Sequence, residues 1–406
     1  MFLGNKKCRI YAVLWRFANA YIRKNLRGNN MTDLQECRQK IDKIDDEIVK
    51  LFEERMKVCE EVAGYKIRTG KKVLDPEREQ AKLEEIRKKA HGEFNALGAQ
   101  ELFQQIMAIS RKRQYQLLTE HGAEEKIDFK TVEQLPRNKV RVVFQGVEGA
   151  YSYGAMRAYF EDDIKSYHVK TFRNAMEEVA AGNADYAVLP IENSTAGIVA
   201  DIYDLLTEYK LFIVGEQILP VEHVLLGLSD AQLSDISCIY SHPQGIAQCK
   251  AYLEEHPAWK TVEVSNTAAA AKKVSEEKEK THAAIASRDA GELYGLRILA
   301  ENICRNDRNV TRFIILGRTP VYEKNASKIS VCFEARHESG TLYNVLSHII
   351  YNGLNMTKIE SRPIPGKTWE YRFFIDFEGN LRESAVKNAL RGMEAETSYL
   401  KILGNY

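Results

Sequence analysis

Apolar residues recur at helical spacing over the first well-patterned stretch of the chain. From Leu34 to Arg68 they follow the 3.6-residue period, at Leu34, Ile41, Ile44, Ile48, Leu51, Val58 and Val62. Thr32 or Asp33 can cap such a helix, and Gly70 ends it. At about 1.5 Å per residue the helix spans roughly 50 Å, more than the width of a small domain. The stripe therefore predicts a dimer whose subunits lend helices to each other.

Two shorter helical patterns follow, at residues 76–91 and 99–119. The next stretch, residues 122–138, is polar and contains Pro136, which is typical of a linker. We therefore expect an all-helical region that is separated by this linker from the rest of the chain.

After the linker the pattern changes from helices to alternating strands and helices. A continuous apolar run at Val140–Phe144 predicts a buried strand, and the alternation continues to about Leu316, which indicates α/β layers. The chain is expected to enter a second lobe after Pro220 and to return to the first near Arg308.

The last part of the chain has the order strand, helix, strand, strand, helix, strand, which predicts a ferredoxin-like βαββαβ unit. Residues 320–327 link it to the α/β lobes. The domain boundaries expected from all these patterns are 1–31, 32–120, 121–138, 139–319 and 327–406.

Composition narrows the class of protein. A chain of 406 residues is long enough for two to four domains. Its formal net charge of +1 argues against a nucleic-acid partner, and no apolar run approaches the length of a membrane span. The seven cysteines are scattered without Cys-x-x-Cys spacing, which favours reduced thiols in a cytoplasmic protein.

The first thirty residues carry seven basic and no acidic side chains. Arg16 interrupts the apolar run Ile10–Trp15, which is too short for a secretory signal. An amphipathic helix on a membrane surface is one interpretation. The other is a dispensable basic extension that precedes a usual start at Met31.

Three short strings lie where a strand-like run gives way to a turn: Pro190–Ser194, Ser241–Gln244 and Thr311–Phe313. Polar groups can converge on a ligand at such strand ends. Together with Glu360–Pro363, these strings resemble the prephenate dehydratase family with its regulatory ACT domain. The helical region resembles an all-α, three-helix chorismate mutase. From about Met31 onward the chain resembles bifunctional chorismate mutase/prephenate dehydratases.

This resemblance implies a multidomain fold and three ligands. The α/β region would be a two-lobed dehydratase domain similar to periplasmic binding proteins, followed by the ferredoxin-like ACT domain. Chorismate and prephenate would be the substrates and phenylalanine the effector, in a homodimer or homotetramer without a cofactor or metal ion.

For the mutase, the resemblance implies eight site residues: Arg38, Arg55, Lys66, Asp75, Arg78, Glu79, Ser110 and Gln114. Arg38 and Arg55 would bind the substrate carboxylates, with Ser110 helping. Lys66 and Gln114 would donate to the ether oxygen, where negative charge grows as the bond breaks. Glu79 would accept from the ring hydroxyl, while Asp75 and Arg78 would shape the start of the helix.

Helical geometry is compatible with an arginine that serves the other subunit. At 100° per residue, Arg55 and Lys66 lie about 20° apart on one face of the first helix. Arg38 lies about 100° from Arg55, so it does not easily reach the same pocket from the same helix. In the family the matching arginine reaches into the partner's site.

For the dehydratase, the resemblance assigns the central role to Thr311. Prephenate must lose its ring hydroxyl as water and a carboxylate as carbon dioxide, and aromatisation drives the decarboxylation. A threonine hydroxyl is too weak an acid to act alone, so we interpret Thr311 as a hydrogen-bond donor or relay. The substrate-binding residues that accompany it are Ser152, Glu192, Asn193, Ser194, Ser241, Gln244, Arg312 and Phe313.

Within this set the expected roles differ. Arg312 would place a positive charge near the substrate, and Ser152 would lie at a helix N-terminus that favours a carboxylate. Glu192 and His242 are candidates for an acid and a base. A histidine before proline is more often a structural hydrogen-bonding residue, so a direct chemical role for His242 is the less favoured interpretation.

For the effector site, the resemblance points to two strings: Gly340, Thr341, Leu342 and Tyr343, and Glu360, Ser361, Arg362 and Pro363. The first departs from the family, because Thr341 stands where alanine is usual and Ser339 where proline is common. Feedback inhibition by phenylalanine is expected, more on dehydration than on rearrangement because of the linker. A dimerisation domain without a ligand is the alternative.

Two other interpretations of the whole chain remain open at this point. One is a non-catalytic amino-acid sensor, built from binding-protein-like lobes and an ACT domain, which would leave the mutase residues unexplained. The other is a mutase with an inactive dehydratase, against which the intact Thr311 argues. Incubation with chorismate and a search for phenylpyruvate would separate the three.

Overall fold

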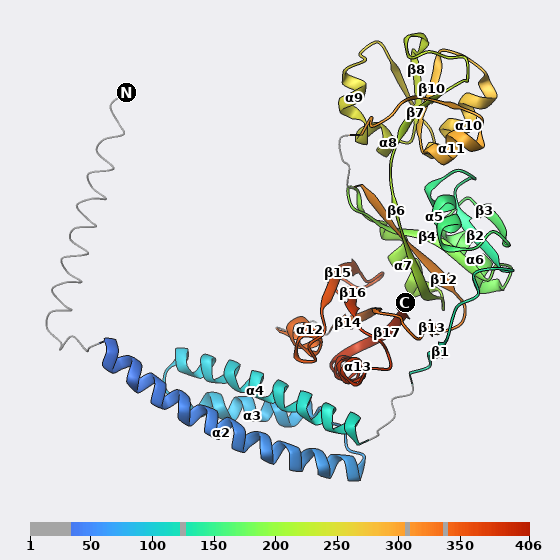
Figure 1. Cartoon of the computed structure of the whole chain (residues 1–406). Coiled ribbons are helices and arrows are strands. Elements are labelled where there is room, and N and C mark those ends of the chain that lie inside the picture. The colour runs from blue at the N-terminus through green and yellow to red at the C-terminus, as the bar shows by residue number, and fades with distance from the viewer. Residues whose placement is uncertain (1–33, 122–126, 305–308, 336–339) are drawn as a thin grey trace, which may run out of the picture. The chain divides into compact units, whose positions relative to one another are not determined.

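The computed structural model describes residues 34–121, 127–304, 309–335 and 340–406, and they fall into two compact units that meet at Val73 and Leu74 (Figure 1). The basic extension and the expected caps Thr32 and Asp33 lie outside the described residues.

The first unit consists of one long helix, α2 (Leu34–Thr69), of 36 residues. It confirms the helix predicted from the apolar period, and Gly70 ends it with a φ of +67°. The seven apolar residues of the predicted stripe are between 39% and 64% exposed, whereas Ala63 is fully buried. Among the described residues, the stripe is therefore largely exposed.

The second unit begins with two helices, α3 (Pro76–Lys89) and α4 (Glu93–Glu120). Asp75 caps α3, because its carboxylate accepts from the backbone N–H of Arg78 at 3.2 Å. Helix α4 starts at Glu93 rather than at the expected 99. Gly92, with a φ of +82°, makes the turn, and Gly98 continues the helix.

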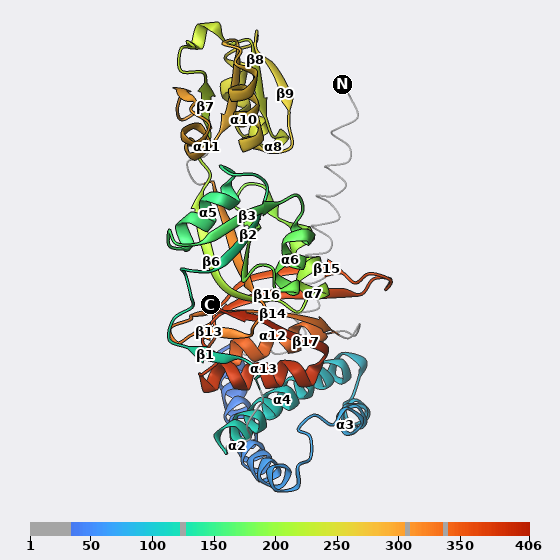
Figure 2. The ribbon, with the colours of Figure 1, turned by 90° about the vertical axis from the view of Figure 1, so that its right-hand side faces the viewer.

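The first α/β lobe is one half of a large sheet covered by helices on both faces (Figures 1 and 2). Its elements are β2 (Arg141–Gln145), α5 (Tyr151–Tyr159), β3 (Lys165–Val169), α6 (Phe172–Ala181), β4 (Tyr186–Asn193), β5 (Gly197–Ile198), α7 (Ala200–Glu208), β6 (Phe212–Pro220) and β12 (Val310–Gly317). Phe144 and Phe313 pack on the α5 side, while Leu189 and Ile314 pack on the α6 and α7 side. This alternation is what a strand buried on both faces requires.

The second lobe has its own five-stranded sheet, in the order β11-β7-β10-β8-β9. Its elements are β7 (Val224–Gly227), η1 (Leu233–Asp235), β8 (Cys238–Ser241), α8 (Pro243–Gln248), α9 (Lys250–Glu254), β9 (Lys260–Glu263), α10 (Thr267–Glu277), β10 (His282–Ala286), α11 (Arg288–Leu293) and β11 (Arg297–Ala300). The chain enters this lobe after Pro220 and returns at β12, which confirms the predicted two-lobed α/β architecture.

The C-terminal unit follows as β14 (Lys328–Ala335), α12 (Thr341–Tyr351), β15 (Met356–Pro363), β16 (Tyr371–Glu378), α13 (Ser384–Glu396) and β17 (Thr397–Asn405). Its four strands lie in the order β15-β16-β14-β17, with every neighbouring pair antiparallel. Beyond β17 the sheet continues into the first lobe, because Gly404 pairs with Ile213 of β6. One ten-stranded sheet thus runs through both regions (Figure 2).

The two stretches expected to be plain connections pair with each other instead. Strand β1 (Lys130–Val132), inside the predicted linker, lies parallel to β13 (Val321–Glu323), inside the second predicted link. A short strand therefore lies inside the stretch expected to be a linker. A three-residue strand is too short to leave a periodic signal in the sequence.

Candidate active sites

A cleft of about 550 Å³ lies between the two α/β lobes. Strands β4 and β12 of the first lobe supply Asn193, Thr311 and Phe313. Helix α8 of the second lobe supplies Gln244 and Gln248. The volume is in the usual range for a small-molecule site, so this cleft is the candidate dehydratase site.

Thr311 lies directly opposite Asn193 in the β12–β4 ladder. The side-chain oxygen of Asn193 accepts from the backbone N–H groups of Thr195 and Ala196, at 3.0 and 2.8 Å. This fixes the amide orientation, so its nitrogen donates to the Thr311 hydroxyl at 2.9 Å and to Asn309 at 2.8 Å. Among the described residues nothing accepts the Thr311 hydroxyl hydrogen, which leaves the group able to donate to a ligand in the cleft.

Arg312 lies on the other face of the same strand. Successive side chains of a strand point to opposite faces, so Thr311 and Phe313 share the cleft face and Arg312 does not. Its partner in the ladder, Glu192, also faces away from the cleft. The expected roles of Arg312 and Glu192 beside the substrate are therefore corrected, and the alternation along Thr-Arg-Phe is the signal that could have shown it.

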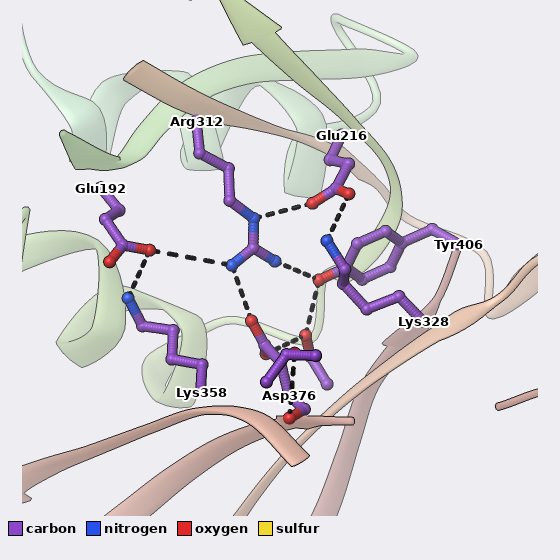
Figure 3. Close-up of polar contacts among 9 residues, drawn as sticks. Glu192, Glu216, Arg312, Lys328, Lys358, Asp376 and Tyr406 are labelled. Atoms are coloured by element: carbon purple, nitrogen blue, oxygen red, sulfur yellow. Dashed lines mark hydrogen bonds and ion pairs between the residues drawn. The ribbon is translucent and has the colours of Figure 1, made fainter. Parts of the chain in front are cut away.

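The Arg312 guanidinium is surrounded by groups from both regions of the sheet (Figure 3). It donates to Glu216 of β6 at 2.7 Å, to Asp376 of β16 at 2.6 Å and to the phenol of Tyr406 at 2.6 Å. Burial alone would lower the pKa of Arg312, but the phenol and the two carboxylates raise it above its usual value. Arg312 therefore remains a cation in this partly buried position.

The rest of this cluster balances its charge. Lys328 pairs with Glu216, and Lys358 of β15 pairs with Glu192 at 2.6 Å (Figure 3). The three cations Arg312, Lys328 and Lys358 thus face the three carboxylates Glu192, Glu216 and Asp376. We call these six residues, with Tyr406, the Arg312 cluster.

Two of the predicted serines hold the backbone rather than line the cleft. Ser241 is fully buried, and its hydroxyl donates to the carbonyl of Ile285 at 2.8 Å. Ser194 accepts from the backbone N–H of Val310 at 3.0 Å. Ser152, at the start of α5, does line the cleft as expected.

His242 caps α8, as the favoured interpretation predicted. Its Nδ1 accepts from the backbone N–H of Gln244 at 3.2 Å, so this nitrogen has a structural task. The ring also lines the cleft, as Gln244 does. The local sequence, histidine before proline, favoured a structural role but did not specify the cap.

A hydrogen-bonded chain in the cleft wall was missed by sequence reasoning. The Tyr151 hydroxyl lies 2.9 Å from Nδ1 of His223, and Nε2 of His223 lies 2.9 Å from Oε1 of Gln248. Burial lowers the pKa of His223, which favours the neutral imidazole. Tyr151 is far from the other two residues in the sequence, so no local pattern predicts that the three side chains meet.

No lysine or arginine is among the described residues that line the cleft. Instead the N-cap residues of α5, α7 and α10, which are Ala150, Val199 and Asn266, all lie in its wall. These helices direct the positive ends of their dipoles and their first backbone N–H groups at the cleft. The arrangement can bind a dianion without a side-chain cation.

The predicted mutase residues fall in both units. In the first unit, Arg38 is exposed, Arg55 and Lys66 are partly buried, and Lys66 donates to the carbonyl of Val73 at 2.7 Å. In the second unit, Asp75 and Arg78 lie at the start of α3. The other three residues, Glu79, Ser110 and Gln114, lie on α3 and α4, and Ser110 and Gln114 are buried.

Glu79 is tied to the C-terminal unit through a buried arginine. Arg111 of α4 donates to Glu79 at 2.5 Å and to Glu396, at the end of α13, at 3.0 Å. Glu396 also lies 3.2 Å from Nε2 of His348 on α12. Nearby, the Lys112 ammonium lies 3.6 Å from the ring centroid of Tyr351. The linker therefore does not keep α4 away from the C-terminal unit, contrary to the expectation.

The expected effector residues lie on two elements of the C-terminal unit. Gly340, with a φ of +80°, caps α12, and Thr341, Leu342 and Tyr343 form its first turn. Residues 336–339 before them lie outside the described residues. On β15, Glu360 and Arg362 are partly buried while Ser361 and Pro363 are exposed. Arg362 binds Asp204 of α7 bidentately, at 3.1 and 2.8 Å.

Within the described ranges, no group of three or more His, Cys, Asp or Glu side chains could hold a metal ion. The same part of the chain contains no helix with the length and apolar character needed to cross a membrane.

The comparisons with known proteins agree with this architecture. The family profile of prephenate dehydratase matches residues 142–321, which are the two α/β lobes and their cleft. The profile of type II chorismate mutase matches residues 37–115, on the three N-terminal helices. Fold and cleft thus define a two-lobed prephenate dehydratase joined to a helical chorismate mutase.

Curated relatives show the same combination in one chain. The bifunctional chorismate mutase/prephenate dehydratase of Enterobacter agglomerans is 36% identical over 91% of this chain and 94% of its own length. That of Escherichia coli K12 is 35% identical over 91% and 95%. The chain belongs to the bifunctional chorismate mutase/prephenate dehydratase family. It converts chorismate to prephenate and prephenate to phenylpyruvate in phenylalanine biosynthesis, and the sensor interpretation is not favoured.

Two solved structures are similar to about two thirds of this chain. The prephenate dehydratase of Arthrobacter aurescens, in complex with L-Phe, has a TM-score of 0.61 at 33% identity, over 66% of this chain and 89% of its own. A protein described as a quorum quenching acylase has a TM-score of 0.60 at 36% identity, over 65% and 96%.

Proposed function

We propose that Thr311 donates a hydrogen bond to the ring hydroxyl of prephenate as that hydroxyl leaves. The observation that carries this role is the fixed Asn193 amide, which occupies an acceptor position of the Thr311 oxygen and leaves its hydrogen for the ligand. The departing oxygen gains negative charge as the bond breaks, so a preoriented donor stabilises the transition state more than the ground state.

The two carboxylates of prephenate are held by backbone N–H groups at the starts of α5, α7 and α10 in this proposal. Ser152 and Gln244 add side-chain hydrogen bonds, since both line the cleft. The donors named here are neutral, which suits the reaction because one carboxylate must leave as carbon dioxide and a fixed cation would oppose that step. The neutral ring of His223 fits the same requirement.

We further propose that the mutase pocket is completed by a second copy of the chain. The exposed apolar stripe of α2 supports this, because seven large apolar side chains on a soluble helix surface favour association. Arg38 would serve the partner's pocket, while Arg55 and Lys66 would act beside Glu79, Ser110 and Gln114. Arg111 would hold Glu79 so that its second oxygen accepts from the ring hydroxyl of chorismate.

The C-terminal unit is proposed to be an ACT domain that binds phenylalanine. Its βαββαβ order and its strand order β15-β16-β14-β17 support a ferredoxin-like fold. The L-Phe complex of the Arthrobacter aurescens enzyme supports the ligand. Gly340 to Tyr343 and Glu360 to Pro363 would form the effector site.

The effect of phenylalanine binding would be transmitted to the dehydratase site through the Arg312 cluster and the Arg362–Asp204 pair. Lys358 and Arg362 lie on β15, which also carries the expected effector string Glu360 to Pro363, and they bind Glu192 and Asp204 of the first lobe. Glu192 precedes Asn193, and Asp204 lies in α7, whose start lines the cleft. Through Arg111 and Glu396 the same unit also contacts α4, so we propose that phenylalanine affects both activities.

The test is a coupled assay of the full chain. Incubation with chorismate should yield prephenate and then phenylpyruvate, and prephenate alone should yield phenylpyruvate. Phenylalanine should lower both rates. Turnover without any response to phenylalanine would contradict the effector site while leaving the two activities in place.

A further inference from the structure

Two cysteines that are far apart in the sequence meet in the second lobe. The sulfur atoms of Cys249 and Cys304 lie 2.8 Å apart, although 55 residues separate them in the chain. Cys249 is fully buried at the junction of α8 and α9, and Cys304 is partly exposed. The expectation of scattered, unpaired thiols came from the spacing of cysteines along the sequence, which does not show contacts between distant residues.

The surroundings make Cys304 the more reactive sulfur. The neighbouring Cys249 thiol and a backbone N–H of His223 lower the pKa of Cys304. The same contact, together with burial, raises the pKa of Cys249. Thiolate is the reactive form of cysteine, so an oxidant from solvent meets the exposed, more acidic Cys304 first, with Cys249 already in contact behind it.

We propose that Cys249 and Cys304 are an oxidation site, where hydrogen peroxide converts the two thiols to an intramolecular disulfide. The Cys304 sulfur attacks one peroxide oxygen; the sulfur–oxygen bond forms, the oxygen–oxygen bond breaks, and the released hydroxide takes the Cys304 proton to leave as water. Cys249 then attacks the sulfenic sulfur, and the second water leaves with the Cys249 proton. Two thiols are oxidised and one peroxide is reduced to two waters.

The disulfide would form directly behind two residues of the cleft wall, Gln248 and His223. Cys249 directly follows Gln248, which holds His223, and His223 in turn contacts Tyr151 of the opposite lobe. A disulfide bond of about 2.05 Å draws the two sulfurs closer than they now lie. The end of α8 must follow Cys249, so the hydrogen bonds of Gln248 to the cleft wall change.

The other described cysteines provide controls. Cys332 is buried in the large sheet, and burial raises the pKa of its thiol to about 12, so it should resist the same oxidant. Cys37 lies on α2, in the other unit. A Cys37→Ser variant removes one thiol without touching the pair.

The direct test is peptide mass spectrometry of the full, reduced chain after treatment with hydrogen peroxide and alkylation. We expect one linked peptide pair, Cys249 with Cys304, in wild type and in Cys37→Ser. Cys249→Ser should instead accumulate a sulfenic acid at Cys304, trapped by a 1,3-dione probe. Absence of the link in folded protein while other thiols react, or a link that forms only in urea, would overturn the proposal.

An activity measurement tests the effect on the cleft, and this arm rests on the dehydratase assignment. Peroxide should lower dehydratase kcat/KM several-fold in wild type, leave mutase activity unchanged, and be reversed by dithiothreitol. Cys304→Ser should be insensitive. A link that forms with no change in dehydration would overturn the coupling to the cleft, and the untreated rates verify separately that the assigned dehydratase is active.

Discussion

The apolar residues of helix α2 and those of the dehydratase strands differ in their exposure to solvent. Val142, Leu189 and Ile314 are fully buried within one chain. The apolar stripe of α2 is between 39% and 64% exposed. The difference teaches that the dehydratase region buries its apolar residues within one chain, whereas the other region presents a surface that we expect a second copy to cover.

The largest effect is expected from Thr311→Ala, which tests the dehydratase cleft alone. Loss of its hydroxyl should lower dehydratase kcat by about 100- to 1,000-fold with little change in KM, because the donor acts mainly in the transition state. Steady-state kinetics with prephenate measures this. Thr311→Ser should retain appreciable activity, and chorismate rearrangement should be unaffected. Normal turnover of the alanine variant would remove Thr311 from the mechanism.

Mixing of mutants then separates the two sites. Arg38→Ala and Arg55→Ala should each lower mutase activity by roughly 10- to 150-fold, from the loss of a charge-assisted contact. After subunit exchange, about one quarter of the pockets should carry neither lesion if Arg38 acts on the partner's pocket. A mixture of Thr311→Ala and Asn193→Ala should show no recovery of dehydration, because both residues serve one cleft. Recovery of dehydratase activity in the control mixture, or no recovery of mutase activity in the arginine mixture, would contradict this difference between the two sites.

The coupling between regions is tested by Asp376→Asn. It removes one carboxylate from the Arg312 cluster and leaves a partly buried cation less compensated, so the thermal midpoint should fall. Inhibition of dehydration by phenylalanine should weaken several-fold, because the link to the catalytic strand is loosened. Glu378→Gln is the matched control, since Glu378 is exposed on the same strand. Equal phenylalanine curves for both variants would exclude the cluster as the route.

A smaller effect is expected at the effector site itself. Thr341→Ala removes a hydroxyl and a β-branch at the start of α12, where the family usually has alanine. Half-inhibition should then need several-fold less phenylalanine, a difference of about 1 kcal/mol. Titration of both proteins at fixed prephenate decides it, and identical curves would mean that Thr341 is a neutral substitution.

No effect is expected from removal of residues 1–30. Both activities and the thermal midpoint should equal those of the full chain, because the segment precedes the cap region of α2 and carries no acidic partner for its charges. A marked loss of mutase activity would show that the extension takes part in covering the α2 stripe.

Much of this architecture could be predicted because its signals are local. The apolar period defined α2 to within a residue, and Gly70 marked its end. The strings Asn193-Ser194 and Thr311-Arg312-Phe313 placed the cleft at the ends of β4 and β12. In each case the information lies within a few residues of the feature.

The errors concern long-range partners. Arg312 was assigned to the substrate because it is a cation beside Thr311, and its actual partner Asp376 follows 64 residues later. His223 and Cys304 meet Tyr151 and Cys249 only because the lobes fold as they do. Charge and residue type indicate which kind of partner a side chain requires, but they do not indicate which distant residue is that partner.

The pairing of Gly404 with Ile213 restricts which C-terminal units could replace the one in this chain. A Cβ at Gly404 would lie 2.0 Å from the carbonyl oxygen of Ile213, so only glycine permits the contact. A chain cut after residue 319 would expose β6 as an unprotected edge, ready to pair with other molecules. Exchange of the C-terminal unit between relatives must therefore preserve this pairing of β17 with β6.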